Sequence, residues 1–202
     1  IYGVPGQTME SWLYSITEAC YSKANHISIY GLQVDNNSPW GKKYAAGQLA
    51  VADEDLAADM FAEGIKLLQK DGFQHYEVAN FSYSLDDEDH TSRHNLAYWQ
   101  RQNYLGLGAG AASCHDDKRW VNTGDLAAYA EALEAGQEPS REKETLTRNQ
   151  VISEAAFLAL RTMVGIEVED FNKRYGVNLK ELFAEPIKKL TEQGLIEFAA
   201  KP

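Results

Sequence analysis

Apolar residues recur along the first eighty positions at two different spacings. Residues 9–20 and 53–68 place them three and four positions apart, which is the period of an amphipathic helix. Short apolar runs at residues 1–4, 27–32 and 73–78 are typical of strands. This alternation predicts an α/β fold in which helical crossovers join parallel strands, as in a doubly wound sheet or a (β/α) barrel.

Folds of this class bind ligands beyond the carboxyl ends of their strands. Glu77 and Asn80 lie at the predicted end of the third strand, where a carboxylate and an amide can both hydrogen-bond a ligand. The same two side chains could equally anchor a loop by capping backbone groups. Four segments are expected to lie together at the carboxyl ends of the strands: residues 3–8, 31–35, 77–82 and 106–113.

The regular alternation stops after the third strand. Charged residues without periodicity predict an exposed loop at residues 84–92, followed by a short helix at 95–102 and a strand at 104–109. Residues 119–123 are expected to form one arm of a hairpin. A further helix is expected at residues 125–136, where a glycine ends it.

The last third of the chain is predicted to be mainly helical. Helices are expected in the stretch 147–162, at residues 168–175 and at residues 179–193. A strand-like run, residues 195–198, follows them. Three helices and the start of a hairpin form the outline of a winged-helix domain, and Pro202 stands where that hairpin should turn back.

A polar stretch, residues 137–144, marks the predicted domain boundary. We therefore expect one domain at residues 1–138 and a second, truncated one at residues 139–202. The net charge of −11 lies entirely in residues 1–140, because the remainder carries ten basic and ten acidic side chains. An acidic surface repels phosphate backbones, which disfavours nonspecific binding of nucleic acid.

Composition also bounds the location and the metal chemistry of the chain. No apolar run is long enough to span a membrane and no signal-peptide pattern opens the sequence, so we predict a cytoplasmic protein. Cys20 and Cys114 are the only cysteines, and neither lies in an array with metal-ligand spacing. They are expected to be buried or idle thiols, without a disulfide and without iron–sulfur ligands.

Two local patterns suggest contact with a ligand. The glycines at positions 106, 108 and 110 lack the spacing of a dinucleotide-binding loop, so they are expected to let the backbone pass close to a ligand or a strand. His94 is followed by Asn95, Tyr98 and Trp99, which gather an imidazole, an amide and two aromatic rings. An imidazole can ligate haem iron and aromatic rings offer flat apolar surface, but a hydrogen-bonded structural histidine stays open.

Taken in order, these motifs resemble the oxygen-independent coproporphyrinogen III oxidase family of radical S-adenosylmethionine proteins. Within that family the chain is most similar to the haem-chaperone branch. The similarity runs over nearly the whole sequence and rests on six segments: residues 1–8, 26–32, 76–81, 94–99, 104–113 and 119–122.

The resemblance implies the C-terminal part of a radical S-adenosylmethionine (β/α) partial barrel, followed by a small winged-helix-like domain. It also implies a Cys-x-x-x-Cys-x-x-Cys motif before Ile1, which this sequence lacks. The chain is therefore expected to be a C-terminal fragment. A [4Fe–4S] cluster and S-adenosylmethionine would be cofactors of the intact protein, and the fragment alone is expected to be inactive.

Several residues take expected roles from the resemblance. Gln33 and Ala112 stand nearest to the family's S-adenosylmethionine contacts, although Gln33 replaces a small residue of the oxidase branch, so a backbone contact is the expected one there. His94 is implied as the haem-iron ligand. The other residues of its motif are implied as the surrounding haem site.

The resemblance favours a haem chaperone that binds haem and passes it to acceptor proteins. The first alternative is the oxidase of the same family, which converts two propionates of coproporphyrinogen III to vinyl groups. A winged-helix binding module is the second alternative, and its charge-balanced last helix argues against nucleic acid as its partner. Homodimerisation stays open.

Overall fold

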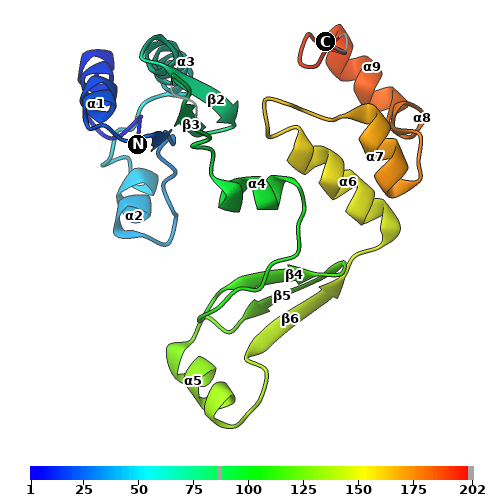
Figure 1. The fold of residues 1–202 in the computed structure, drawn as a ribbon. Coiled ribbons are helices and arrows are strands. Elements are labelled where there is room, and N and C mark those ends of the chain that lie inside the picture. The colour runs from blue at the N-terminus through cyan, green and yellow to red at the C-terminus, as the bar shows by residue number, and fades with distance from the viewer. Residues whose placement is uncertain (86–87, 200–202) are drawn as a thin grey trace. The chain divides into compact units, whose positions relative to one another are not determined.

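The computed structural model describes residues 1–85 and 88–199 of the 202-residue chain. The chain forms two compact units (Figure 1). Unit 1 consists of residues 1–100 together with 161–163, and unit 2 consists of residues 101–160 together with the chain from residue 164 onward. The predicted domains, residues 1–138 and 139–202, stay a prediction.

Unit 1 is built on a small antiparallel sheet. Its strands are β1 (His26–Ser28), β2 (Phe73–Glu77) and β3 (Asn80–Tyr83), in the order β1-β3-β2. The β2–β3 connection is a tight hairpin closed by the pair Glu77 and Asn80. Strands β1 and β2 therefore run in the same direction, with β3 antiparallel between them.

This arrangement corrects two details of the sequence prediction. Residues 77–82 were expected on a ligand-binding rim, but residues 80–82 belong to β3, because the two residues between β2 and β3 allow a hairpin and are too few for a crossover. The expected strand at residues 1–4 is reduced to one parallel bridge between Tyr2 and Gly31. The α/β fold class itself is confirmed.

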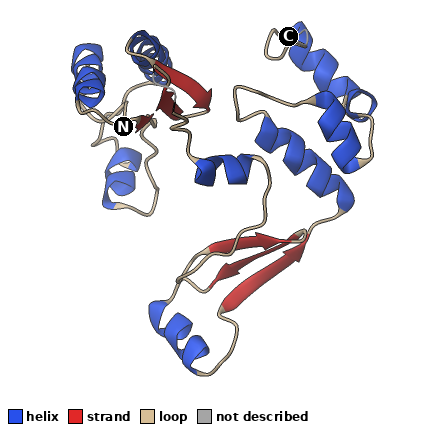
Figure 2. Cartoon of the chain, in the orientation of Figure 1, coloured by secondary structure: helices blue, strands red, loops and turns tan. Residues whose placement is uncertain are grey.

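Two long helices form the hydrophobic core of unit 1 with the sheet (Figure 2). Helix α1 (Met9–Tyr21) begins at a capping box, and α3 (Glu54–Lys70) begins at Asp53, whose carboxylate accepts from the Leu56 amide. A short helix, α2 (Pro39–Ala45), lies between β1 and α3 in the sequence. The core residues are Trp12, Ile16, Ile27, Ile29, Met60, Leu68, Phe73 and Phe81.

Unit 1 is completed by a short helix and by a distant piece of chain. Helix α4 (Arg93–Trp99) begins at Ser92, whose hydroxyl accepts from the Asn95 amide at 3.2 Å. Residues 161–163 pair with β2 through an antiparallel bridge between Thr162 and Glu77. This segment thereby extends the sheet at β2.

Unit 2 contains a second antiparallel sheet and a helical part (Figure 2). Strands β4 (Ala112–His115), β5 (Lys118–Asn122) and β6 (Ser140–Thr145) follow one another, with α5 (Leu126–Glu134) between the last two. The expected strand at residues 104–109 is reduced to a single bridge between Tyr104 and Cys114. Strand β6 lies in the polar stretch where the sequence suggested only a linker.

The helical part of unit 2 contains α6 (Arg148–Ala159), α7 (Val168–Tyr175), α8 (Leu179–Leu182) and α9 (Ala184–Glu192). Its core consists of Ile152, Ala155, Ala156, Phe171 and Leu179. The single helix expected at residues 179–193 is broken at Phe183, because Pro186 cannot continue an existing helix but fits the first turn of a new one. Residues 195–198 do not form the expected strand.

Candidate functional site

A buried carboxylate fixes the end of α4 against the β2–β3 hairpin. The Glu77 side chain is 1% exposed and accepts a hydrogen bond of 2.7 Å from Trp99 Nε1. Its second oxygen accepts from the Ala79 amide at 3.3 Å. The Arg161 guanidinium lies over the Trp99 ring, 4.6 Å from the ring centroid. The indole is therefore held at its edge by an anion and at its face by a cation.

The start of α4 is held by a second buried group, the Tyr76 hydroxyl. Its oxygen accepts from the Ser92 amide at 3.1 Å and from the Asn95 side chain. The same hydroxyl forms a hydrogen bond of 2.8 Å with His26 Nε2. Burial raises the pKa of Tyr76 and lowers the pKa of His26, so a neutral phenol hydrogen-bonds a neutral imidazole.

The four motif residues of α4 divide into two pairs, each four positions apart. Asn95 and Trp99 hold the helix to the hairpin through Tyr76 and Glu77. His94 is exposed, and its ring meets the edge of Tyr98 with centroids 4.9 Å apart and planes at 89°. The His94 imidazole forms no hydrogen bond with any residue that the structure describes. One pair therefore anchors the helix, and the other presents an imidazole beside an aromatic ring.

The two residues predicted for a ligand-binding rim both have protein partners. Asn80 is 3% exposed and accepts a hydrogen bond from the Ser28 hydroxyl, which joins β3 to β1. Glu77 contacts Trp99 and the hairpin turn, as described above. These contacts match the loop-anchoring alternative, and a direct contact with a ligand stays a prediction for both residues.

The positions associated with S-adenosylmethionine lie in different units. Gln33 is exposed in unit 1, directly after Leu32, whose amide donates to the Tyr2 carbonyl at 2.8 Å. Ala112 is exposed at the start of β4 in unit 2. The part of both residues in binding the cofactor stays a prediction.

The glycine loop before β4 is tied down by hydrogen bonds within unit 2. Asn122 Nδ2 donates to the carbonyls of Gly108 and Gly106 at 2.9 and 3.3 Å. Their amides donate to the hydroxyls of Tyr129 and Ser113, at 3.0 and 2.9 Å respectively. A Cβ at Gly106 would lie 2.1 Å from the Ala112 carbonyl oxygen, so the expected close passage of two backbone segments is confirmed here.

The glycine loop also borders a cleft of about 460 Å³ in unit 2. The apolar part of its lining includes Leu105, Leu107, Trp120, Tyr129 and Leu133. Leu105 and Leu107 are 69% and 82% exposed. The leucine side chains of the loop are therefore exposed, while its backbone forms hydrogen bonds with side chains of unit 2.

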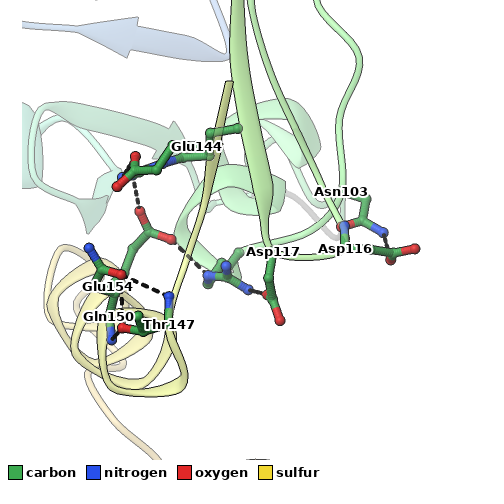
Figure 3. A network of polar contacts seen from close by, with 9 residues as sticks. Asn103, Asp116, Asp117, Glu144, Thr147, Gln150 and Glu154 are labelled. Atoms are coloured by element: carbon green, nitrogen blue, oxygen red, sulfur yellow. Dashed lines mark hydrogen bonds and ion pairs between the residues drawn. The ribbon is translucent and has the colours of Figure 1, made fainter. Parts of the chain in front are cut away.

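An ionic network joins the second sheet to α6 (Figure 3). Glu154 of α6 accepts from Arg101 at 2.8 Å and from Arg119 at 2.6 Å. Arg119 also contacts Glu144 at 2.7 Å, and Arg101 contacts Asp117 at 2.9 Å. All five residues belong to unit 2, so the network gives Arg119, one of the motif residues, a structural partner.

Known proteins resemble this arrangement in sequence and in fold. Residues 146–201 match the HemN C-terminal domain. Haem chaperones named HemW from Lactococcus lactis and Bacillus subtilis are 33% and 32% identical to the chain. Both alignments cover 97% of this chain, and 50% and 51% of the respective relatives. This chain is a relative of the HemN and HemW proteins.

The fold of the chain is also similar to that of a solved structure. The coproporphyrinogen III oxidase HemN of Escherichia coli, described as a radical SAM enzyme, superposes with a TM-score of 0.76 and 19% identity. The alignment covers 99% of this chain and 48% of HemN. The resemblance predicted from the sequence and the fold class are thereby confirmed. The chain spans about half the length of the relatives that it matches.

The chemistry of the donor groups decides which of the cofactors expected from the sequence the described residues fit. Cys20 and Cys114 lie in different units, and burial with a hydrogen bond to Asp71 raises the pKa of Cys20 to about 11. Burial also raises the pKa of Cys114. Two thiols that stay protonated do not fit an iron–sulfur cluster, which thiolates hold. The exposed imidazole of His94, with Tyr98 beside it, does fit haem iron.

No described helix is long and apolar enough to cross a membrane.

Sequence reasoning did not predict that Arg161 contacts Trp99. It also did not predict that the Tyr76 hydroxyl contacts both His26 and Ser92. Periodicity placed Arg161 at the end of a helix, and no local pattern connects it with Trp99. His26 was expected to be structural or solvent-facing, and its bond to Tyr76 gives it a structural role. The recurrence of His26 and Tyr76 in the family motifs was the only available signal.

Proposed function

We propose that this chain carries the haem-binding part of a radical S-adenosylmethionine haem chaperone. The single observation that carries the proposal is the exposed His94 imidazole, set against Tyr98 on a helix whose other face is anchored by Asn95 and Trp99. The relatives in Lactococcus lactis and Bacillus subtilis are named haem chaperones, which supports the same function.

The proposed chemistry uses one exchangeable ligand. Neutral imidazole binds haem iron, and the Tyr98 ring supplies apolar surface beside the macrocycle. Because α4 is fixed before haem arrives, binding costs little ordering of the helix. A single exposed ligand also leaves the opposite side of the iron open to a ligand from an acceptor protein, as transfer of the haem requires.

The intact protein is proposed to bind a [4Fe–4S] cluster and S-adenosylmethionine, with Gln33 and Ala112 near the latter. Glu77 and Asn80 are proposed to support the site from beneath. We further propose a cytoplasmic location, haem-acceptor proteins as partners, and domains at residues 1–138 and 139–202.

The second candidate is oxygen-independent oxidation of coproporphyrinogen III. It is supported by the fold likeness to HemN, which spans almost the whole chain. An oxidase handles a metal-free porphyrinogen and has no use for an iron ligand, so the role of His94 separates the two candidates.

Haem titration followed at the Soret band tests the proposal. We expect the 202-residue chain to bind one haem, and His94→Ala to weaken binding about tenfold or more, because the iron loses its protein ligand. His115→Ala is the matched control, since this histidine is also exposed but lies in unit 2. Equal affinity and an unchanged Soret band in His94→Ala would exclude His94 as the ligand.

A further inference from the structure

Arg161 reaches α4 from a part of the sequence that otherwise builds unit 2. It follows α6, and residues 161–163 leave the helical part of the chain to pair with β2. The Val78 amide donates to the Arg161 carbonyl at 2.9 Å, and the Met163 amide donates to the Tyr76 carbonyl at 3.0 Å. Two backbone hydrogen bonds therefore fix the position from which the Arg161 side chain extends.

The Trp99 indole receives two interactions that reinforce each other. Arg161 lies over its face at 4.6 Å, and Glu77 accepts its N–H proton at 2.7 Å. Hydrogen bonding to an anion increases the electron density of the ring, which strengthens its attraction for a cation at its face. The three side chains thus act as a stack that fixes the C-terminal end of α4.

Helix α4 depends on such external contacts. It has seven residues, which is too short to be stable by itself. Its N-terminal end is held by Tyr76 and its C-terminal end by Trp99. If the second contact loosens, the helix can turn about the first, and the imidazole of His94 changes direction.

We propose that Arg161 is a positioning residue for the haem site, acting through Trp99 to set the orientation of α4 and therefore of His94. This inference rests on the proposed haem-binding function. Residue 161 also falls within residues 146–201, the region that matches the HemN C-terminal domain. The haem site is thus incomplete without a side chain from that region.

Hydrogen exchange in the ligand-free chain tests the positioning role independently of haem. We expect Arg161→Gln to raise amide exchange in residues 93–99 about tenfold, because the cation over the indole is lost. Arg161→Lys keeps the positive charge and should restore much of the protection. The matched control is Arg174→Gln, which removes another arginine stacked on an aromatic ring, 5.3 Å from the centroid of Tyr175 in α7. This control should leave residues 93–99 unchanged.

Haem titration of the same variants tests the consequence for the site. We expect Arg161→Gln to weaken haem binding about tenfold and to change the electron paramagnetic resonance signal of the ferric haem, because the imidazole plane is no longer fixed. Arg161→Lys should retain most of the wild-type signal. Loss of affinity with an unchanged signal would indicate a merely structural role and would overturn the proposal.

The two hypotheses fail in different ways. If the wild-type chain binds no haem, the proposed function is wrong and the inferred role at the haem site falls with it, whatever the exchange shows. If the wild-type chain binds haem while Arg161→Gln leaves affinity, signal and exchange unchanged, the function stands and the positioning role is wrong.

Discussion

Glu77 in unit 1 and Glu154 in unit 2 both connect a helix to a sheet, but in opposite surroundings. Glu77 is 1% exposed and is met by the N–H groups of Trp99 and Ala79. The Glu154 side chain is 23% exposed and lies between two arginines in the middle of the ionic network (Figure 3). The first carboxylate is held by donors of fixed direction, and the second by two arginines, of which Arg119 is 41% exposed and Arg101 11%.

The difference shows where the structure tolerates change. A buried carboxylate must keep its donors, because an unmatched charge or N–H group in the interior carries its full desolvation cost. A partly exposed ion pair loses less, since water and salt replace the missing partner. The haem-site candidate rests on the first kind of contact, so its geometry should be sensitive to single substitutions.

The largest expected effect comes from Glu77→Ala. It leaves the Trp99 and Ala79 N–H groups without an acceptor, and we expect a loss of about 3 kcal/mol in the free energy of unfolding. Urea unfolding followed by circular dichroism measures this loss. Glu63→Ala, at a half-buried position of α3 where the side chain is 44% exposed, is the control and should cost about 0.5 kcal/mol. Similar losses of unfolding free energy in the two variants would contradict the expected difference between a buried and a more exposed carboxylate.

A smaller effect is expected for Glu154→Gln. The variant keeps the side-chain shape but removes the charge facing Arg101 and Arg119, so we expect a loss of about 1 kcal/mol at low salt. Because the pair is partly exposed, most of this difference should vanish at about 1 M sodium chloride. Glu144→Gln, which affects only Arg119, should cost less. A loss independent of salt would show that Glu154 behaves like a buried group.

The smallest expected effect is a pH dependence from His26. Burial lowers its pKa from the ordinary value of 6.5, so the unfolded chain takes up a proton at a higher pH than the folded chain. The contribution of His26 is therefore complete above about pH 6.5 and is lost as the pH falls through the lowered pKa. Urea midpoints between pH 5 and 8 should show this slope, and His26→Asn should flatten it. An equal slope in the variant would assign the effect to other groups.

The sequence was sufficient to predict the helices that have a regular amphipathic pattern. Helices α1, α3 and α7 were predicted because apolar residues recur in them every three to four positions. Strands β3 and β6 were missed. The first follows a two-residue turn within one continuous motif, and the second is rich in charged residues. Neither shows the apolar run by which strands are recognised.

The candidate site was predictable as a set of residues but not as a geometry. The motif at residues 94–99 stood out, whereas its division into an anchoring pair and a presenting pair depends on which partners lie beneath the helix. Those partners, Glu77 and Tyr76, come from a strand that the sequence placed correctly. Arg161 could not be found, because its contact with Trp99 follows from a strand pairing between distant segments.

The pairing of residues 161–163 with β2 has a practical consequence for dividing the protein into parts. A version that ends before residue 161 keeps the whole motif at residues 94–99 but uncovers the backbone amides and carbonyls along the outer side of β2. Exposed strand edges of this kind recruit other chains. Shortened versions should therefore self-associate and precipitate, and expression work on the first unit needs the chain at least to residue 163.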